Sequence, residues 1–173
     1  MEISTPLFVI GIKDVTPSEK EKVRKHIAIE IILKILLGKS SGLFNELYKQ
    51  NLIQDELDAS YEFSSNYAHI LIQGQSQSPE KLLDMLKQEI EKIKNNGINK
   101  DEFERARKSV YASYIKEYNR IDEISIMFLS DYFKGINSFE YLEEFNAVTT
   151  TYVEQTLKNV FKEETTTLSV IRK

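Results

Sequence analysis

Two hydrophobic periods follow each other in the first quarter of the chain. The apolar run Leu7–Ile12, bounded by Pro6 and Lys13, predicts a central strand that is buried on both faces. After Ser18 the spacing becomes helical, because three of the four i, i+4 rows between Val23 and Leu37 are apolar. Such a helix must be covered almost all round, so we expect the sheet on one side and other helices on another.

The segment from Asp58 to Gln75 returns to the period of a strand. Tyr61 and Phe63 alternate with polar neighbours, residues 64–66 supply a turn, and the apolar run Tyr67–Ile72 follows. Two strands joined by so short a turn pair in antiparallel fashion. The segment therefore predicts a β-hairpin.

Capping residues and apolar stripes predict helices before and after this hairpin. We expect helices over Leu43–Leu52, Pro79–Asn96, Lys100–Tyr118, Asp122–Lys134, Ser138–Phe145 and Thr149–Phe161, and a closing strand over Thr167–Arg172. The predicted class is α+β, with a β-α-β-β start, an antiparallel sheet, several helices layered on one face and a C-terminal strand. With no repeat or linker, residues 1–173 are predicted to form one domain.

Composition excludes several kinds of chemistry. The 173 residues include 23 Lys and Arg, 27 Asp and Glu, two His and no Cys, for a net charge of −4. Disulfides, cysteine-ligated metals and thiol catalysis are therefore excluded, and two histidines are too few for a histidine-rich metal site. A slightly acidic chain without a long basic run argues against nucleic acid as a partner.

The chain shows no sequence signal for a membrane. The most apolar window, Ile27–Leu37, is interrupted by Glu30 and Lys34 and is much shorter than the roughly 20 residues of a membrane span. The first residues have no basic region followed by an apolar stretch. We therefore expect no membrane partner and a cytoplasmic location.

The two histidines are the first candidates for a functional site. His26 and Glu30 lie four residues apart on one helix face, and Lys34 continues the row. One His and one Glu beside a cation are too few for a metal, so the row is interpreted as a solvated stripe with a Glu30–Lys34 pair. His69 lies among apolar residues of a strand and is interpreted as a hydrogen-bonded structural residue.

Other patterns favour structural roles as well. Ser40-Ser41-Gly42 lacks the full Gly-rich, Lys-Ser/Thr pattern of a phosphate loop, and a helix cap with a close packing contact is the simpler interpretation. Acidic pairs at helix ends are typical of solvated charges. One set of aromatic residues recurs at helical spacing and predicts core packing: Tyr111, Tyr114, Tyr118, Phe128, Tyr132 and Phe133.

The segment Ser41–Ile53 resembles a known signature. It is similar to the pattern small-small-Leu-Phe-x-Glu-Leu-Arg-x-x-x-Gly-Leu-x-Tyr of the insulinase/pitrilysin superfamily of zinc peptidases, which includes mitochondrial processing peptidase. The flanking strand, long helix, hairpin and later helices follow in the order of the C-terminal half of such a subunit. The resemblance covers essentially the whole chain and implies the processing-peptidase-like α+β fold.

Two departures from the family pattern bear on function. The family binds zinc through an inverted H-x-x-E-H motif in its N-terminal half. This motif is absent here, so the resemblance implies no catalytic and no metal-ligating residue in this chain. Many relatives also supply a substrate-contacting Arg and, seven residues later, a Tyr. The matching positions are Tyr48 and Asp55. The carboxylate of Asp55, which stands in place of the Tyr, would oppose developing oxyanion charge.

This pattern resembles that of the bacterial two-subunit members of the family. The resemblance implies that the chain is a non-catalytic C-terminal half. Such a half would wall a peptide-enclosing chamber and hold a subunit interface. Its expected partners are the N-terminal half of the same subunit, a second homologous subunit and a peptide substrate, with zinc bound by the parent enzyme if its N-terminal half carries the motif. Two alternatives stay open: a free-standing, inactive assembly or binding module, and a phosphate-binding or small-ligand domain that uses Ser40–Gly42.

Overall fold

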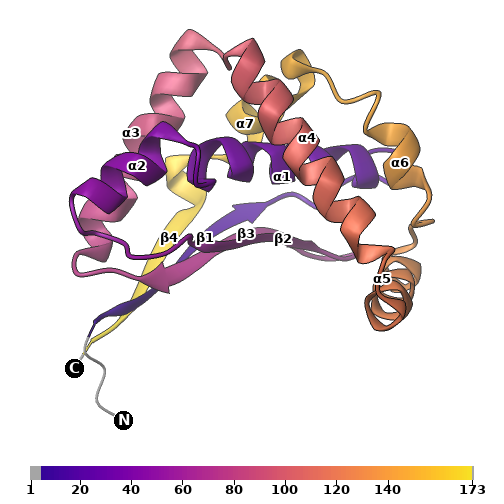
Figure 1. Ribbon diagram of the computed structural model, residues 1–173, viewed down its shortest axis with the longest axis horizontal. Coiled ribbons are helices and arrows are strands. Elements are labelled where there is room, and N and C mark those ends of the chain that lie inside the picture. The colour runs from indigo at the N-terminus through magenta and orange to yellow at the C-terminus, as the bar shows by residue number, and fades with distance from the viewer. Residues whose placement is uncertain (1–4, 173) are drawn as a thin grey trace.

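The computed structural model describes residues 5–172 and builds one sheet with a layer of helices over it (Figure 1). The strands are β1 (Leu7–Asp14), β2 (Asp58–Phe63), β3 (Ala68–Gln75) and β4 (Thr166–Ile171). The helices are α1 (Lys22–Leu37), α2 (Gly42–Lys49), α3 (Pro79–Asn96), α4 (Lys100–Glu117), α5 (Ile121–Lys134), α6 (Glu140–Glu144) and α7 (Thr150–Val160), with a 3-10 turn over Glu163–Thr165. The predicted α+β class and order of elements are confirmed.

The sheet is antiparallel throughout, with the strand order β2-β3-β1-β4. The hairpin pairs Phe63 with Ala68, and the first residue of β1, Leu7, pairs with the last residue of β4, Ile171. The first and last strands therefore lie side by side, and Leu7 and Ile171 lie at the same end of the sheet (Figure 1).

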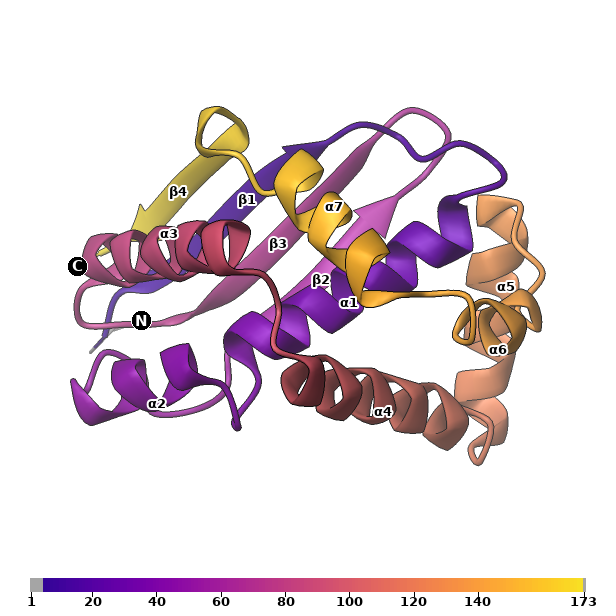
Figure 2. The ribbon, with the colours of Figure 1, turned by 90° about the horizontal axis from the view of Figure 1, so that it is seen from above.

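Helix α1 forms the centre of the core. It runs across one face of the sheet and packs against β2, α2, α4, α6 and α7 (Figure 2). Side chains on three of its faces, including Ile27, Ile29 and Ile31, are completely buried. This surrounding contact explains why the helix carries apolar residues on three of its four rows.

The expectation that β1 is buried on both faces is wrong. Phe8, Ile10 and Ile12 face the helices and are buried, whereas Leu7 and Val9 on the opposite face are only half-buried. Among residues 5–172, no helix lies over that opposite face, and α5 is placed beyond the end of α1 (Figures 1 and 2). The name open face is used below for this side of the sheet.

Helix α5 also corrects the aromatic prediction. Tyr132 and Phe133 are 76% and 75% exposed, so they do not pack in the core, and Tyr111 is exposed as well. Tyr114 does pack against the core. Helical spacing predicted the helix correctly, but it could not show that the exposed aromatic residues of α5 have no covering element among residues 5–172.

No helix within the described residues is both long and apolar enough to cross a membrane.

Candidate functional site

The two family positions lie on the surface. Tyr48 projects from α2 with 56% of its surface exposed, and its ring stacks on Phe44 with 6.2 Å between centroids. Asp55 is exposed in the loop that joins α2 to β2. A contact of either residue with a substrate remains a prediction.

Ser41 caps the N-terminus of α2. Its hydroxyl accepts a hydrogen bond from the Phe44 backbone N–H at 3.0 Å and donates to the Leu36 carbonyl oxygen at 2.9 Å. Both bonding directions of the hydroxyl are thus used within the protein. This geometry supports the structural interpretation of Ser40–Gly42 over a phosphate site.

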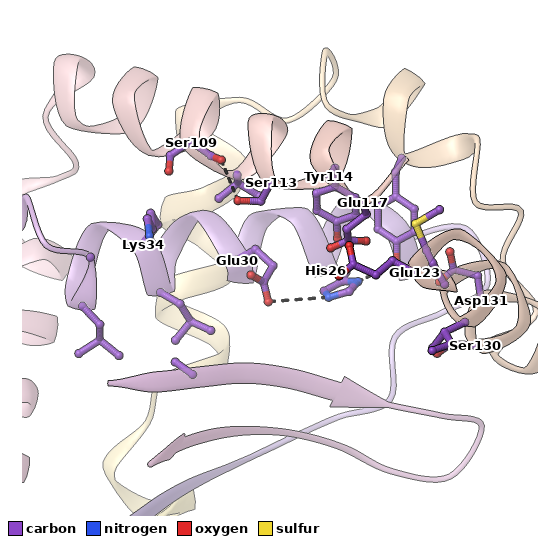
Figure 3. Close-up of a pocket in the computed structure, with 18 of the residues that line it drawn as sticks. His26, Glu30, Lys34, Ser109, Ser113, Tyr114, Glu117, Glu123, Ser130 and Asp131 are labelled. Atoms are coloured by element: carbon purple, nitrogen blue, oxygen red, sulfur yellow. Dashed lines mark hydrogen bonds and ion pairs between the residues drawn. The ribbon is translucent and has the colours of Figure 1, made fainter. Parts of the chain in front are cut away.

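A pocket of about 730 Å³ opens between α1, α4, α5 and the start of β2 (Figure 3). Helix α1 supplies the polar row of His26, Glu30 and Lys34, and α4 and α5 supply further carboxylates and aliphatic side chains. Its charged and aromatic lining residues are His26, Glu30, Lys34, Glu56, Tyr114, Glu117, Glu123, Asp131, Lys134 and Tyr141.

His26 is fixed in this pocket as a neutral imidazole. Its Nδ1 shares a hydrogen bond of 2.7 Å with the Tyr141 hydroxyl, and its Nε2 lies 3.8 Å from Glu30 Oε1. Burial, with a contribution from the positive charge of Lys134, lowers the pKa of His26 to about 3. The imidazole is therefore uncharged at neutral pH.

Glu30 has the opposite shift. Burial raises the pKa of its carboxyl to about 7, and the negative charges of Glu117 and Glu62 add to the effect. Lys34 does not pair with Glu30, because its ammonium binds Glu56 at 3.1 Å. The predicted solvated stripe with a Glu30–Lys34 pair is therefore wrong.

The remaining charges of the pocket are mostly matched. Glu123 pairs with Arg120 at 2.6 Å, and Lys134 pairs with Glu62 at 3.8 Å. Asp131 accepts a 2.7 Å hydrogen bond from Ser138, while burial raises the pKa of this carboxyl. The pocket is therefore lined by polar side chains beside the hydrophobic core, and most of these side chains are held by contacts within the protein.

The pocket combines one weakened base with carboxyls whose pKa is raised. A general base needs a pKa near the working pH; the carboxyl of Glu30, with a pKa of about 7, meets this condition, whereas His26, with a pKa of about 3, is too weak a base. The Ser113 hydroxyl donates to the Ser109 carbonyl oxygen at 3.2 Å. Among residues 5–172, no group of three or more His, Cys, Asp or Glu side chains is placed to hold a metal ion. The residues present therefore do not fit a zinc site.

His69 lies on the open face, and its ring centroid is 5.6 Å from that of Tyr67. The hydrogen bonds found among residues 5–172 include none to its imidazole, which differs from the expected hydrogen-bonded residue.

Comparison with known families decides the identity of the domain. A family model described as the peptidase M16 inactive domain matches residues 13–110, which is more than half of the chain. The chain belongs to the peptidase M16 inactive-domain family. The resemblance to the C-terminal half of a zinc peptidase subunit is confirmed.

One curated relative of this M16 domain is a much longer protein. The chain is 22% identical over 166 residues to the uncharacterized zinc protease YmfH of Bacillus subtilis, matching 95% of this chain and 38% of that protein. The M16 domain therefore spans well under half of this relative.

Solved structures share the fold of the M16 domain. An M16-like peptidase from Alicyclobacillus acidocaldarius superposes with a TM-score of 0.89 at 17% identity, over 97% of this chain and 41% of that one. The inactive peptidase domain of a zinc protease from Bordetella parapertussis gives a TM-score of 0.81 at 13% identity, over 100% of this chain and 93% of that one. At these identities the comparison establishes the fold.

Sequence reasoning missed most of the pocket of the M16 domain. The polar row of His26 and Glu30 was a usable signal, because it interrupts an otherwise apolar helix. The contributions of Tyr114, Asp131 and Tyr141 could not be found, because they come from three later helices whose placement the pattern does not specify.

Proposed function

We propose that this M16 domain is the non-catalytic half of a zinc metallopeptidase and that its open face forms part of a peptide-enclosing chamber. The observation that carries the proposal is the uncovered side of the sheet. An antiparallel sheet buries one face on its own helices and leaves the other to solvent or to a partner.

The chemistry of the open face suits contact with extended polypeptide. Val9 and Leu71 provide half-buried aliphatic surface at its centre, and Leu7 does so at one end of the sheet. Ser60, Gln73, Thr167 and Ser169 surround this surface with hydroxyl and amide groups, which hydrogen-bond to peptide groups of any sequence.

A hollow of about 450 Å³ extends the open face toward the chain ends. Its lining includes Leu7, Gln75 and Ile171 as well as Asp58 from the beginning of β2. The loop that carries Asp55 leads directly into this strand, and the residue after it, Glu56, also lines the hollow.

The proposed work of such a wall is positional. A chamber that holds an extended peptide beside a reactive centre lowers the entropic part of the barrier without contributing a reacting group. The reactive centre would belong to the N-terminal half of the same subunit, with zinc bound there, and a second homologous subunit would complete the enclosure. The cytoplasm remains the predicted location.

The isolated chain provides the test. After incubation with zinc and dialysis, metal analysis is expected to find far less than one zinc per chain, and quenched peptides are expected to stay intact. One tightly held zinc per chain, together with chelator-sensitive peptidase activity, would contradict the proposal. The upstream coding sequence distinguishes this proposal from the alternative of a free-standing module. A longer reading frame that encodes H-x-x-E-H supports the peptidase half, whereas a native start at Met1 supports the free-standing module.

A further inference from the structure

The pocket between α1, α4, α5 and β2 carries more negative than positive charge. Among the described residues that line it, five side chains are carboxylates and two, Lys34 and Lys134, are cations. His26 adds no positive charge, because its imidazole is neutral. A cavity of this size with converging polar groups is typical of a binding site. The charge imbalance indicates which class of ligand the site accepts.

Three of the five carboxylates have no cation partner. Glu56 is neutralised by Lys34, which it binds at 3.1 Å. Glu123 is neutralised by Arg120 at 2.6 Å. Among residues 5–172, the structure shows no ion pair with a Lys or Arg side chain for the other three lining carboxylates, which are Glu30, Glu117 and Asp131.

Asp131 is the least exposed of these three residues. It is only 7% exposed, and one of its carboxylate oxygens accepts the hydrogen bond from Ser138 at 2.7 Å. The second oxygen accepts no hydrogen bond from the part of the chain that the structure describes. Removing a carboxylate from water is costly unless a cation or hydrogen-bond donors replace the water. Asp131 therefore favours a ligand that brings both positive charge and N–H donors.

The unpaired carboxylates lie close enough to repel one another. Burial raises the pKa of Glu30 first of all, and the negative charge of Glu117 adds to the effect. Burial also raises the pKa of Glu117, with contributions from the charges of Glu123 and Asp131. A cation placed between these groups would relieve the repulsion.

The spacing of the carboxylates suits an extended cation better than a single metal ion. Among residues 5–172, no three His, Cys, Asp or Glu side chains come close enough together to hold one ion. The lining residues of α1 extend from His26 to Leu37, which corresponds to about 16 Å along the helix. Figure 3 shows Asp131 beyond the His26 end of this row and Lys34 toward the other end. An organic cation can place separate nitrogen atoms at separate carboxylates along this length.

The walls of the pocket suit the rest of such a cation. The rings of Tyr114 and Tyr141 stack with 4.9 Å between their centroids, and both rings line the pocket. Aromatic rings attract ammonium groups through the negative charge of their faces. Leu33, Leu57 and Ile126 provide apolar surface against which methylene groups can pack.

From these observations we infer that the pocket binds an organic cation whose ammonium groups are carried on a flexible aliphatic chain. Free polyamines and the lysine side chains of a peptide share this chemistry. The ammonium groups donate to the carboxylates of Glu30, Glu117 and Asp131, because each primary ammonium offers three N–H donors. The inference does not rest on the proposed function, since the pocket lies on the helical side of the sheet and not on the open face.

Calorimetric titration of the 173-residue chain at low salt is the first test. Spermidine is the probe for a free polyamine, and a short peptide with blocked ends and two lysines is the probe for side chains. The same peptide with acetylated lysines is the uncharged control. At least one charged probe is expected to bind with one site per chain, and the tighter of the two identifies the source of the cation. If neither probe binds, or if the acetylated peptide binds as well as the charged one, the inference is wrong.

Substitutions that remove one charge locate the site. Glu30→Gln and Glu117→Gln preserve the size of the side chain and are each expected to raise the dissociation constant at least about tenfold, because a charged hydrogen bond to the ligand is lost. Glu46→Gln is the matched control, since it removes the same charge from an exposed position of α2 and should change the constant by less than about twofold. Equal weakening by all three variants would show attraction by net charge alone and would overturn the inference.

A substitution that preserves every charge tests the cavity itself. Ser113 of α4 lines the pocket, so the ring in Ser113→Phe occupies space that the ligand needs. This variant is expected to weaken binding at least about tenfold. Ala112→Phe is the matched control, because Ala112 is exposed on the same helix and is not one of the lining residues. Circular dichroism verifies that both variants fold. A folded Ser113→Phe variant that binds the probe as tightly as the natural chain would contradict binding in this pocket.

Discussion

Glu30 offers a direct test of the electrostatics of the pocket. Its carboxyl has a folded-state pKa of about 7, compared with an ordinary value of 4.5. The folded protein therefore binds more protons than the unfolded chain between these two pH values, and its stability falls as the pH rises through this window. Replacement by Gln removes this dependence while retaining the size of the side chain.

The magnitude follows from the size of the pKa shift. A difference of about 2.5 units corresponds to about 3.4 kcal/mol once both states are ionised. The Glu30 side chain is 30% exposed, so solvent screening reduces this value, and we expect about 1 to 2 kcal/mol. At pH 8, Glu30→Gln should be more stable than the natural chain by this amount, which raises Tm by about 3 to 6 °C in a domain of this size. At pH 4.5 or below, the two proteins should differ little.

Urea unfolding at the two pH values, followed by circular dichroism, measures the effect. Glu46→Gln is the matched control, because that side chain is 55% exposed on α2 and should show no gain at pH 8. A Glu30→Gln variant that loses stability at pH 8, or that gains equally at both pH values, would refute the assignment of a desolvated carboxylate that has no ion pair with Lys34.

Three further substitutions test the structure around the site. His26→Phe should cost about 1 kcal/mol at pH 7 through loss of the Tyr141 hydrogen bond. In urea titrations, the free energy of unfolding of the natural chain should fall by about 2 kcal/mol more than that of this variant between pH 7 and pH 5. The reason is that His26 stays neutral in the folded protein, because its pKa is lowered, whereas the unfolded chain takes up a proton at this residue below pH 6.5. Equal losses would contradict a buried neutral imidazole. Ser41→Ala should destabilise the domain by about 1 to 2 kcal/mol by removing the cap of α2, whereas Ser40→Ala, at an exposed position, should have little effect on Tm. Leu36→Ala at a fully buried position of α1 should cost about 2 to 5 kcal/mol in chemical denaturation, and a cost below about 1 kcal/mol would indicate that α1 is not the centre of the core.

The fold was predictable where the local pattern carries the physical cause. The Asn99 side chain caps α4 by accepting hydrogen bonds from two backbone N–H groups, and Gly97 ends α3 with a positive φ of 78°. Both signals are short-range, so they can be recognised in the sequence. The burial of α1 was predictable too, because a helix apolar on three rows needs cover on three sides.

The errors arose where tertiary placement decides the outcome. An apolar run such as Leu7–Ile12 fits a strand buried on both faces, yet Val9 lies on the open face of a two-layer structure. Tyr132 and Phe133 have helical spacing, but no described element covers them. Glu30 was assigned to solvent because its Lys34 neighbour suggested a pair, whereas Glu56 from the loop before β2 takes that lysine.

The family could be identified from the sequence, whereas the roles of the site residues could not be established from it. The segment around Ser41–Ile53 identified the family because its motif is contiguous. The roles of Tyr48 and Asp55 remain predictions, since both side chains are exposed and a substrate contact depends on polypeptide outside residues 5–172.

Cross-linking from the open face tests the central claim most directly. A photoreactive label is attached to a single cysteine in the full-length protein that carries this chain, with any other cysteines replaced. Gln73→Cys places the label on the open face, and Glu91→Cys places it on the exposed side of α3. The account predicts that an unfolded peptide is captured from position 73 and not from position 91. Equal capture from both positions, or capture from position 91 alone, would contradict an open face that lines the peptide chamber.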